Sequence, residues 1–273
     1  MNDPDETPVP ISVPISWMTH SDNVNCETEF ECKDEIDETA KCGQRCWTQV
    51  PNDQTFEYTF KGERFGIYGS KDPAHGKFDL YLNNANLTTI DEYANTRQDY
   101  TLLYLSDVLE YNQYTIKAAG IGDIFEIYKF VFWPSMKARR INSTEMSATQ
   151  TWTREPDYIG GIGEWTNNVG ATKSATIQGS KVWVYGSEAH NHGIMNIQFR
   201  NPIVDKDTEN PNRVDGKLIW ESDEERFNIH SLVITAKKDI YVLCVYYLYD
   251  PPAQTSTPDP SRTPIPDSND RYI

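Results

Sequence analysis

One stretch of this sequence occurs twice, and this internal repeat limits what the chain can fold into. Both copies read an aliphatic residue, Tyr-Gly-Ser, four variable residues and then His-Gly, over residues 66–76 and 183–193. Tyr68 and Tyr185 are therefore 117 positions apart. A second pair of related segments, 102–116 and 218–232, follows in the same order at an offset of 116. Two motifs repeated in the same order predict a tandem duplication of one domain.

The composition is that of a folded protein, and 273 residues are enough for two domains that each bury a core. Lys and Arg number 25 against 41 Asp and Glu, so the formal net charge is -16. Such a surface repels phosphate backbones and anionic lipids, and we expect neither nucleic acid nor a membrane as partner. No apolar run approaches the roughly 20 residues of a membrane span.

Short segments in which apolar and polar residues alternate recur along both copies and predict β-strands. Phe56, Tyr58 and Phe60, for example, alternate with Glu57 and Thr59. The expected strands lie at 56–60, 65–68, 78–82, 100–105, 113–119 and 124–133 in the first copy, and at 175–177, 181–185, 194–199, 218–220, 232–235 and 240–249 in the second. Residues 200–217 read as a polar loop. No segment has the pattern of a long amphipathic helix, so we expect an all-β protein made of two tandem jelly-roll sandwiches.

The domain boundaries follow from the proline content and from the repeat. We expect an extended Pro-rich arm at 1–15, a first sandwich at 16–134, a linker at 135–149, a second sandwich at 150–249 and a Pro-rich arm at 250–273. Proline at this density prevents regular helix, and such arms are disordered unless a partner holds them. The acidic start lacks the basic residues and apolar stretch of a secretory signal, which predicts an intracellular protein.

Relative to the second copy, the first contains an insertion at 18–46 with four cysteines. Cys42 and Cys46 have the spacing of a zinc-ligand pair, whereas Cys26 and Cys32 are more widely spaced. Two disulfides are the natural interpretation in a secreted chain, and free thiols in a reducing compartment. The sequence leaves zinc, disulfides and free thiols open. No cofactor is expected beyond the zinc that the first interpretation requires.

Several segments together resemble a known family. The first copy reads aromatic-x-Phe-x-Gly at 58–62, aliphatic-Tyr-Gly at 67–69 and His-Gly before a strand at 75–76. Residues 109–116 resemble a Leu-x-x-x-x-His-Thr-Ile element, with Tyr114 at the place of the His; the second copy has His230 there. This pattern resembles the tandem galactose-binding-domain-like β-sandwiches of fungi and flagellated protists. The resemblance is stronger over 47–134 than over 165–249. It implies a jelly-roll fold, which serves sugar binding, lipid binding and protein assembly alike.

The sequence contains no recognisable catalytic motif. Gly-x-Ser-x-Gly and His-Glu-x-x-His are both missing, and the glycines at 160–163 lack the strand-then-helix context of a phosphate-binding loop. We therefore expect no enzymatic activity.

Ligand binding would require exposed aromatic rings beside polar groups. The candidate ligand-binding residues are Tyr68, His75, Tyr93, Arg97, Tyr185 and His192. Most aromatic residues of the chain fall at inward positions of the expected strands, which favours core roles. For His75 and His192 we favour a role in bracing the turn before the repeated glycine.

We expect a non-enzymatic structural or interaction protein in a large intracellular assembly. The most specific version is a cytoskeletal or flagellar microtubule-associated protein, with tubulin or other cytoskeletal proteins bound through the Pro-rich arms. The outer surface of tubulin is acidic like this chain, so a luminal or protein-bridged position is favoured. The alternative is a carbohydrate-binding, lectin-like module at the cell surface or secreted, where the sequons at Asn86 and Asn142 would carry glycans.

Overall fold

The chain is an all-β protein, as the sequence predicts. The computed structural model describes residues 9–14, 19–20, 24–28, 44–48, 55–155, 163–200, 203–211 and 214–250. Within these ranges the secondary structure consists of strands and one 3-10 turn, η2 (Ser143–Glu145). Residues 1–8 and 251–273, which make up most of the two predicted arms, lie outside the described residues, as do Cys32 and Cys42.

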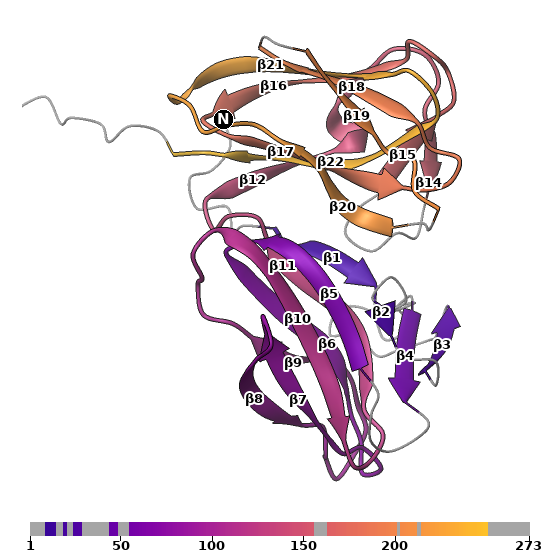
Figure 1. Cartoon of the computed structure of the whole chain (residues 1–273), viewed down its shortest axis with the longest axis vertical. Coiled ribbons are helices and arrows are strands. Elements are labelled where there is room, and N and C mark those ends of the chain that lie inside the picture. Colours follow the sequence, from indigo (N-terminus) through magenta and orange to yellow (C-terminus); the bar gives the residue numbers. More distant parts are fainter. Residues whose placement is uncertain are drawn as a thin grey trace, which may run out of the picture.

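The first sandwich packs one sheet of order β3-β4-β11-β6-β9 against another of order β2-β5-β10-β7-β8, with β1 added beside β11 (Figure 1). Its strands are β1 (Ile11–Pro14), β2 (Thr19–His20), β3 (Val24–Thr28), β4 (Gln44–Thr48), β5 (Thr55–Gly62), β6 (Arg64–Lys71), β7 (Lys77–Leu82), β8 (Ala85–Asp91), β9 (Gln98–Leu105), β10 (Asn112–Ile121) and β11 (Glu126–Trp133).

The second sandwich repeats this strand order. One sheet is β14-β15-β22-β17-β20 with β12 beside β22, and the other is β13-β16-β21-β18-β19. Its strands are β12 (Ala138–Asn142), β13 (Ser147–Ala148), β14 (Thr153–Glu155), β15 (Gly163–Thr166), β16 (Thr172–Gly179), β17 (Val182–Glu188), β18 (Ile194–Phe199), β19 (Ile203–Asp207), β20 (Val214–Glu221), β21 (Asn228–Ala236) and β22 (Ile240–Leu248). The Tyr-Gly-Ser copies lie on β6 and β17, which hold the same place in the two sandwiches.

The differences from the expected strands lie mainly at sheet edges. β8 and β19 are edge strands with mostly exposed residues, so they have no apolar face from which a strand could be predicted. β19 replaces part of the polar loop expected at 200–217. Most of the segment expected as a linker, 135–149, belongs to the second sandwich, because β12 pairs with β22 and β13 with β16.

The N-terminal strand β1 completes the first sandwich instead of forming part of a free arm. It pairs antiparallel with β11. Ile11 and Val13 are buried, with exposed fractions of 1% and 0%. The hydroxyl of Tyr246, on β22 of the second sandwich, donates a hydrogen bond of 2.9 Å to the carbonyl oxygen of Val9. Residues 9–14 therefore contact both sandwiches.

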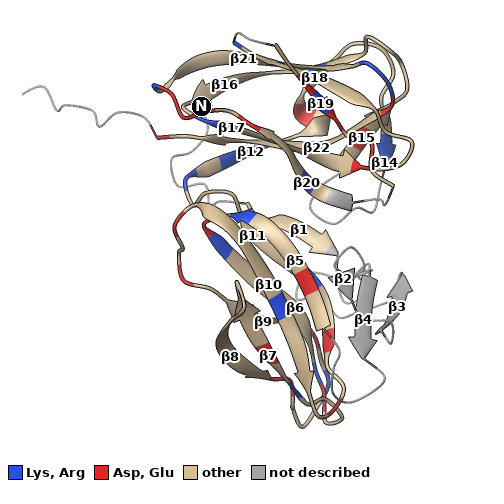
Figure 2. Ribbon diagram, viewed as in Figure 1, with Lys and Arg blue, Asp and Glu red and all other residues tan. Residues whose placement is uncertain are grey.

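One apolar cluster runs through the first sandwich and includes buried residues of β17 and β22, while the second sandwich also has a separate core of its own. The β22-β17-β20 part of one sheet of the second sandwich lies across one end of the first sandwich (Figure 1). On β17, Val182 and Val184 face the core of the second sandwich, whereas Trp183 and Tyr185 belong to a cluster that extends through the first. The Tyr185 ring lies 6.0 Å from that of Phe132. β22, which has no charged residue (Figure 2), is likewise buried on both faces, and this explains its uninterrupted apolar sequence.

We call the interface between the two sandwiches the joint. A cluster of polar side chains lies at one side of it. Trp183 Nε1 donates a 2.6 Å hydrogen bond to the hydroxyl oxygen of Tyr111, which in turn donates to Glu221. Lys61 pairs with the same carboxylate, and Lys181 lies 3.7 Å from it. Burial opposes the charge of Glu221, but hydrogen bonds from Lys61 and Tyr111 and the charge of Lys181 outweigh it and lower the pKa of this carboxyl. The joint thus combines apolar burial with a satisfied ion pair.

Candidate functional site

The repeated motif has a packing reason in both sandwiches. A Cβ atom on Gly69 would lie 2.2 Å from the carbonyl oxygen of Glu126, and one on Gly186 would lie 2.3 Å from that of Tyr241. Neither backbone can retreat without breaking the β6–β11 or β17–β22 ladder, so only glycine fits. The Gly of Tyr-Gly-Ser is therefore explained by the fold and does not require a ligand.

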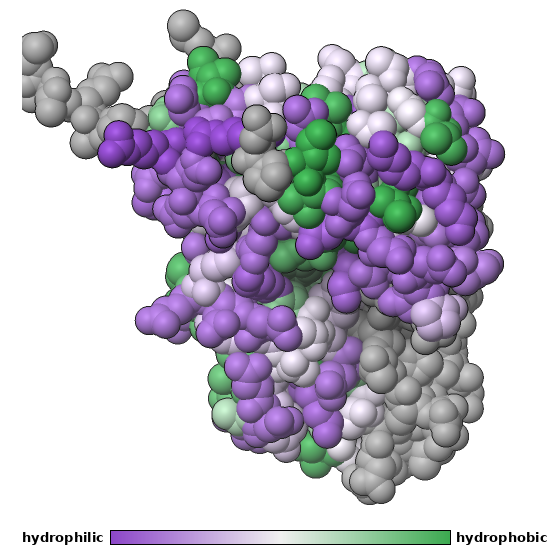
Figure 3. All heavy atoms as spheres, turned by 45° about the horizontal axis from the view of Figure 1, so that its top comes forward, coloured by the Kyte–Doolittle hydropathy of each residue, from purple (hydrophilic) through white to green (hydrophobic). Residues whose placement is uncertain are grey.

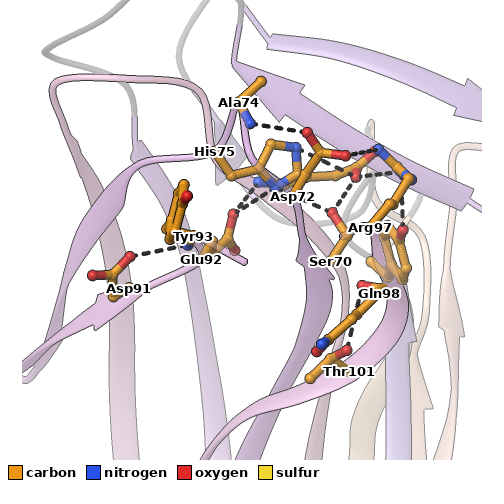
Figure 4. A network of polar contacts seen from close by, with 12 residues as sticks. Ser70, Asp72, Ala74, His75, Asp91, Glu92, Tyr93, Arg97, Gln98 and Thr101 are labelled. Atoms are coloured by element: carbon orange, nitrogen blue, oxygen red, sulfur yellow. Dashed lines mark hydrogen bonds and ion pairs between the residues drawn. The ribbon is translucent and has the colours of Figure 1, made fainter. Parts of the chain in front are cut away.

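A polar cluster surrounds the first copy of the motif (Figure 4). Its members are Ser70 from β6, Asp72 and His75 from the loop before β7, Glu92 after β8, Arg97 and Asp99 at the start of β9, and Glu126 and Tyr128 from β11. We call this set the Glu126 cluster. Ser70 donates a hydrogen bond to Glu126, and Arg97 Nη2 donates another of 2.9 Å to the same oxygen.

Glu92 and His75 form the buried part of the cluster. His75 Nδ1 lies 3.4 Å from Glu92 Oε2, which also accepts a 2.8 Å hydrogen bond from the backbone N–H of Glu126. Glu92 is fully buried, and burial raises its pKa to about 7 against the opposing pull of His75 and that backbone N–H. Burial also disfavours the charged imidazole, but Glu92, Glu126 and Asp72 outweigh it and raise the pKa of His75. Both groups thus favour the protonated state in the folded protein.

Arg97 closes the cluster toward solvent. Its Nε donates a 2.8 Å hydrogen bond to Asp99, which accepts another of 2.7 Å from the hydroxyl of Tyr128. Asp72 lies 3.7 Å from Nη1 of the same guanidinium. Burial works against the cation, but Glu126, Tyr128 and Asp99 outweigh it and raise the pKa of Arg97. The guanidinium is shared among three carboxylates, so the cluster ties β6, β9, β11 and the loop before β7 together.

The equivalent region of the second sandwich has the serine and histidine of the motif, Ser187 and His192, but lacks carboxylates at the positions of Asp72 and Glu126. His192 Nδ1 donates to the carbonyl oxygen of Ser187 at 2.9 Å. Strand register places Ala189 at the position of Asp72 and Tyr241 at that of Glu126. A cavity of about 350 Å³ occupies this region, lined by Trp165, Ala189, His190, Asn191, His192, Asp239, Ile240 and Tyr241.

The structure brings some of the predicted ligand-binding residues together and separates others. His75 and Arg97 meet in the Glu126 cluster. Tyr93, 56% exposed, follows Glu92 directly and donates its hydroxyl hydrogen bond to Asn95, 3.0 Å away. Tyr68 is half-buried, with its ring 5.5 Å from that of Tyr100.

Tyr185 and His192 lie in the second sandwich. Tyr185 is fully buried at the joint, so its ring offers no surface platform. His192 lines the cavity. In the insertion, the backbone register of β3 and β4 places Cys26 directly opposite Cys46. Among the described residues, no group of three or more His, Cys, Asp or Glu side chains is arranged to hold a metal ion.

Sequence reasoning missed most of the carboxylates in the Glu126 cluster. Glu126 had a detectable signal, because it and Lys129 are the two charged residues, apart from the preceding Asp123, in the mostly apolar stretch that forms β11, and the structure buries its side chain. Glu92 had no such sequence signal, because it follows the exposed edge strand β8 and no apolar pattern surrounds it. Trp165 and Asp239 are 74 positions apart and line the same cavity because β15 pairs with β22.

The chain is similar to solved all-β structures at low identity. No family model matches the sequence, and no curated protein matches it. A xanthan lyase from Paenibacillus matches with 12% identity and a TM-score of 0.33, over 92% of this chain and 27% of that one. A cycloisomaltooligosaccharide glucanotransferase from Paenibacillus sp. matches with 7% identity and a TM-score of 0.31, over 90% and 46%.

A cupin 2 conserved barrel domain protein from Leptotrichia buccalis matches with 9% identity and a TM-score of 0.24, over 91% of this chain and 92% of that one. The chain thus spans about a quarter of the length of the xanthan lyase and less than half of the glucanotransferase. At such TM-scores these similarities carry no functional conclusion.

Proposed function

We propose that this chain is a non-enzymatic structural protein of a larger protein assembly, most specifically a cytoskeletal or flagellar microtubule-associated one. The observation that carries the proposal is the joint. The shared apolar cluster, the Glu221 ion pairs and strand β1 hold the two sandwiches in one fixed arrangement. A chain that presents two surfaces at a set distance and angle suits a lattice, where subunits must repeat without flexing.

The outer face of the β13-β16-β21-β18-β19 sheet supports a protein partner. In a chain of net charge -16, the exposed residues of its central strand β21 are uncharged. Ile229 on β21, Ile203 on β19 and Ile194 on β18 are exposed by 64%, 53% and 40%. Figure 3 shows hydrophobic surface divided into separate patches among hydrophilic residues on the side that faces the viewer. Exposed apolar patches rimmed by polar residues are typical of protein interaction surfaces.

The Glu126 cluster fits this role better than catalysis. Its guanidinium and carboxylates bind one another, and its serine is fully buried between Glu126 and His75, where a substrate cannot reach the hydroxyl. In the described part of the chain, no helix is long and apolar enough to span a bilayer.

The test is detergent extraction of native cells that express the tagged chain, followed by mass spectrometry of the insoluble cytoskeleton. We expect the wild type in that fraction, with Asn86 and Asn142 unmodified. Glu221→Lys places a third cation between Lys61 and Lys181, opens the joint and should reduce this recovery. Glu224→Lys makes the same charge change at an exposed position and should not.

Recovery of the wild type in the membrane or secreted fraction, with glycans on the two sequons, would refute the proposal. It would favour the carbohydrate-binding alternative instead.

A further inference from the structure

A guanidinium group beside the joint has no carboxylate to pair with it. Arg140 is on β12, and strand register places it next to Tyr246 on β22. Its guanidinium carbon lies 5.9 Å from the centroid of the Tyr246 ring. Among the described residues, its buried Nε and Nη2 atoms have no hydrogen-bond partner, and no carboxylate forms an ion pair with it. A buried cation without a counter-ion is costly, so an anion should complete this site.

The groups packed around Arg140 do not supply this anion. Cys244 and Tyr246 are its buried neighbours on β22. Burial raises the pKa of the Cys244 thiol to about 11 and holds the pKa of the Tyr246 hydroxyl well above its ordinary value, so both are neutral near pH 7. Glu145 also acts on Arg140, but its carboxylate is exposed and accepts a 2.6 Å hydrogen bond from the backbone N–H of Asn142.

The acidic N-terminal segment of the chain joins the structure next to this site. The hydroxyl of the same Tyr246 donates a 2.9 Å hydrogen bond to the carbonyl oxygen of Val9. The eight residues before Val9 contain no Lys or Arg and three acids, Asp3, Asp5 and Glu6. Each residue of an extended chain spans at most about 3.6 Å, so Glu6 lies within about 11 Å of Val9. Since Val9 and the guanidinium both lie next to one tyrosine side chain, these carboxylates can reach Arg140.

We propose that a carboxylate of residues 1–8 pairs with the Arg140 guanidinium, so that the acidic N-terminal segment docks on the chain's own joint. Charge favours this occupant, because a chain of net charge -16 repels an acidic segment overall, whereas Arg140 attracts it. The pair extends the contact of residues 9–14 with both sandwiches. This contact lies within one chain and does not depend on the proposed function. It gives the N-terminal arm an intramolecular role instead of a cytoskeletal partner.

A double-mutant cycle, measured by urea unfolding of the full chain, tests this contact. One change is Arg140→Met, which removes the charge and keeps an apolar side chain, a replacement that buried ion pairs generally tolerate. The other neutralises the segment by Asp3→Asn, Asp5→Asn and Glu6→Gln together. Neutralisation should lower the equilibrium constant for folding at least about tenfold in the wild type, which corresponds to about 1.4 kcal/mol, and should have little effect in Arg140→Met.

The matched control neutralises three acids of the C-terminal segment by Asp259→Asn, Asp267→Asn and Asp270→Asn. It should change the folding constant equally little with and without Arg140. Equal effects of the N-terminal neutralisation in the wild type and in Arg140→Met would overturn the proposal. Coupling of Arg140 to the C-terminal acids instead would overturn it as well.

Sodium acetate, compared with sodium chloride at the same concentration, separates the segment from a free anion at Arg140. We expect the two salts to act alike on the wild type, because the segment fills the site, and acetate to stabilise the segment-neutralised variant more than chloride does. If acetate preferentially stabilises the wild type and loses this effect in Arg140→Met, the site is open to free carboxylates and the proposal fails.

Discussion

Replacing the buried carboxyl of the Glu126 cluster should change how stability depends on pH. Glu92 has an ordinary pKa of 4.5, and burial raises it to about 7 in the folded protein. The folded state therefore binds this proton more tightly than the unfolded chain. The stabilisation is complete below about pH 4.5 and is lost as the pH rises through about 7. This difference corresponds to about 3 kcal/mol in the free energy of unfolding.

The raised pKa of His75 acts in the same direction, because it also contributes stability at low pH that is lost as the pH rises. In Glu92→Gln the side chain stays neutral at every pH and can still accept from the backbone N–H of Glu126. The variant should match the wild type near pH 4 and exceed it by up to about 3 kcal/mol near pH 8.

Urea unfolding at a series of pH values from 4 to 8.5 measures this difference. Glu110→Gln is the control, since it makes the same chemical change at an exposed residue that does not belong to the Glu126 cluster. The control should follow the wild type throughout. If the free energy of unfolding of Glu92→Gln runs parallel to that of the wild type across the range, Glu92 does not hold its proton as described.

Three further predictions follow from single contacts. Gly69→Ala should lower the free energy of unfolding by more than about 2 kcal/mol, because its Cβ would meet a backbone oxygen at 2.2 Å; a thermal melt close to that of the wild type would contradict this. The hydroxyl of Tyr185 is buried and has no hydrogen-bond partner among the described residues, so Tyr185→Phe should leave stability unchanged or raise it by about 1 kcal/mol in urea unfolding, and a clear loss would argue against it. Cys26 and Cys46 are register partners on adjacent antiparallel strands, and the Cα atoms of such partners generally lie about 4.5–5.5 Å apart, a separation that a disulfide can span. Peptide mapping after mild oxidation should therefore find them linked to each other, and a Cys26–Cys32 link would contradict this.

The sequence was sufficient to predict the fold class and most central strands. Period-two alternation identifies β5, because Phe56 and Phe60 are buried while Glu57 and Thr59 are exposed. Edge strands such as β8 and β19 escaped this reasoning, because they bury too little to show alternation. The apolar stretch of β22 was recognised as a strand, but its second buried face was not predictable. That face packs on the first sandwich, a contact that no local pattern encodes.

The candidate site was predictable only in part. The repeat drew attention to His75 and His192. Both lie in the turn before a strand, where their backbone N–H groups donate to the carbonyl oxygens of Asp72 and Ala189. Glu92 and Arg97 join His75 and Glu126 through contacts between segments that are distant in sequence, and one sequence without its fold cannot show such contacts. The same holds for Trp165 and Asp239, which line one cavity although they are distant in sequence.

Differential scanning calorimetry of the wild type and of Glu221→Lys tests the central claim most directly, namely that one apolar cluster joins the two sandwiches. The account predicts a single transition for the wild type, with calorimetric and van't Hoff enthalpies that agree for the whole chain. The charge-reversed variant should resolve into two transitions, and Glu224→Lys should keep one. Two separate transitions in the wild type would contradict the account.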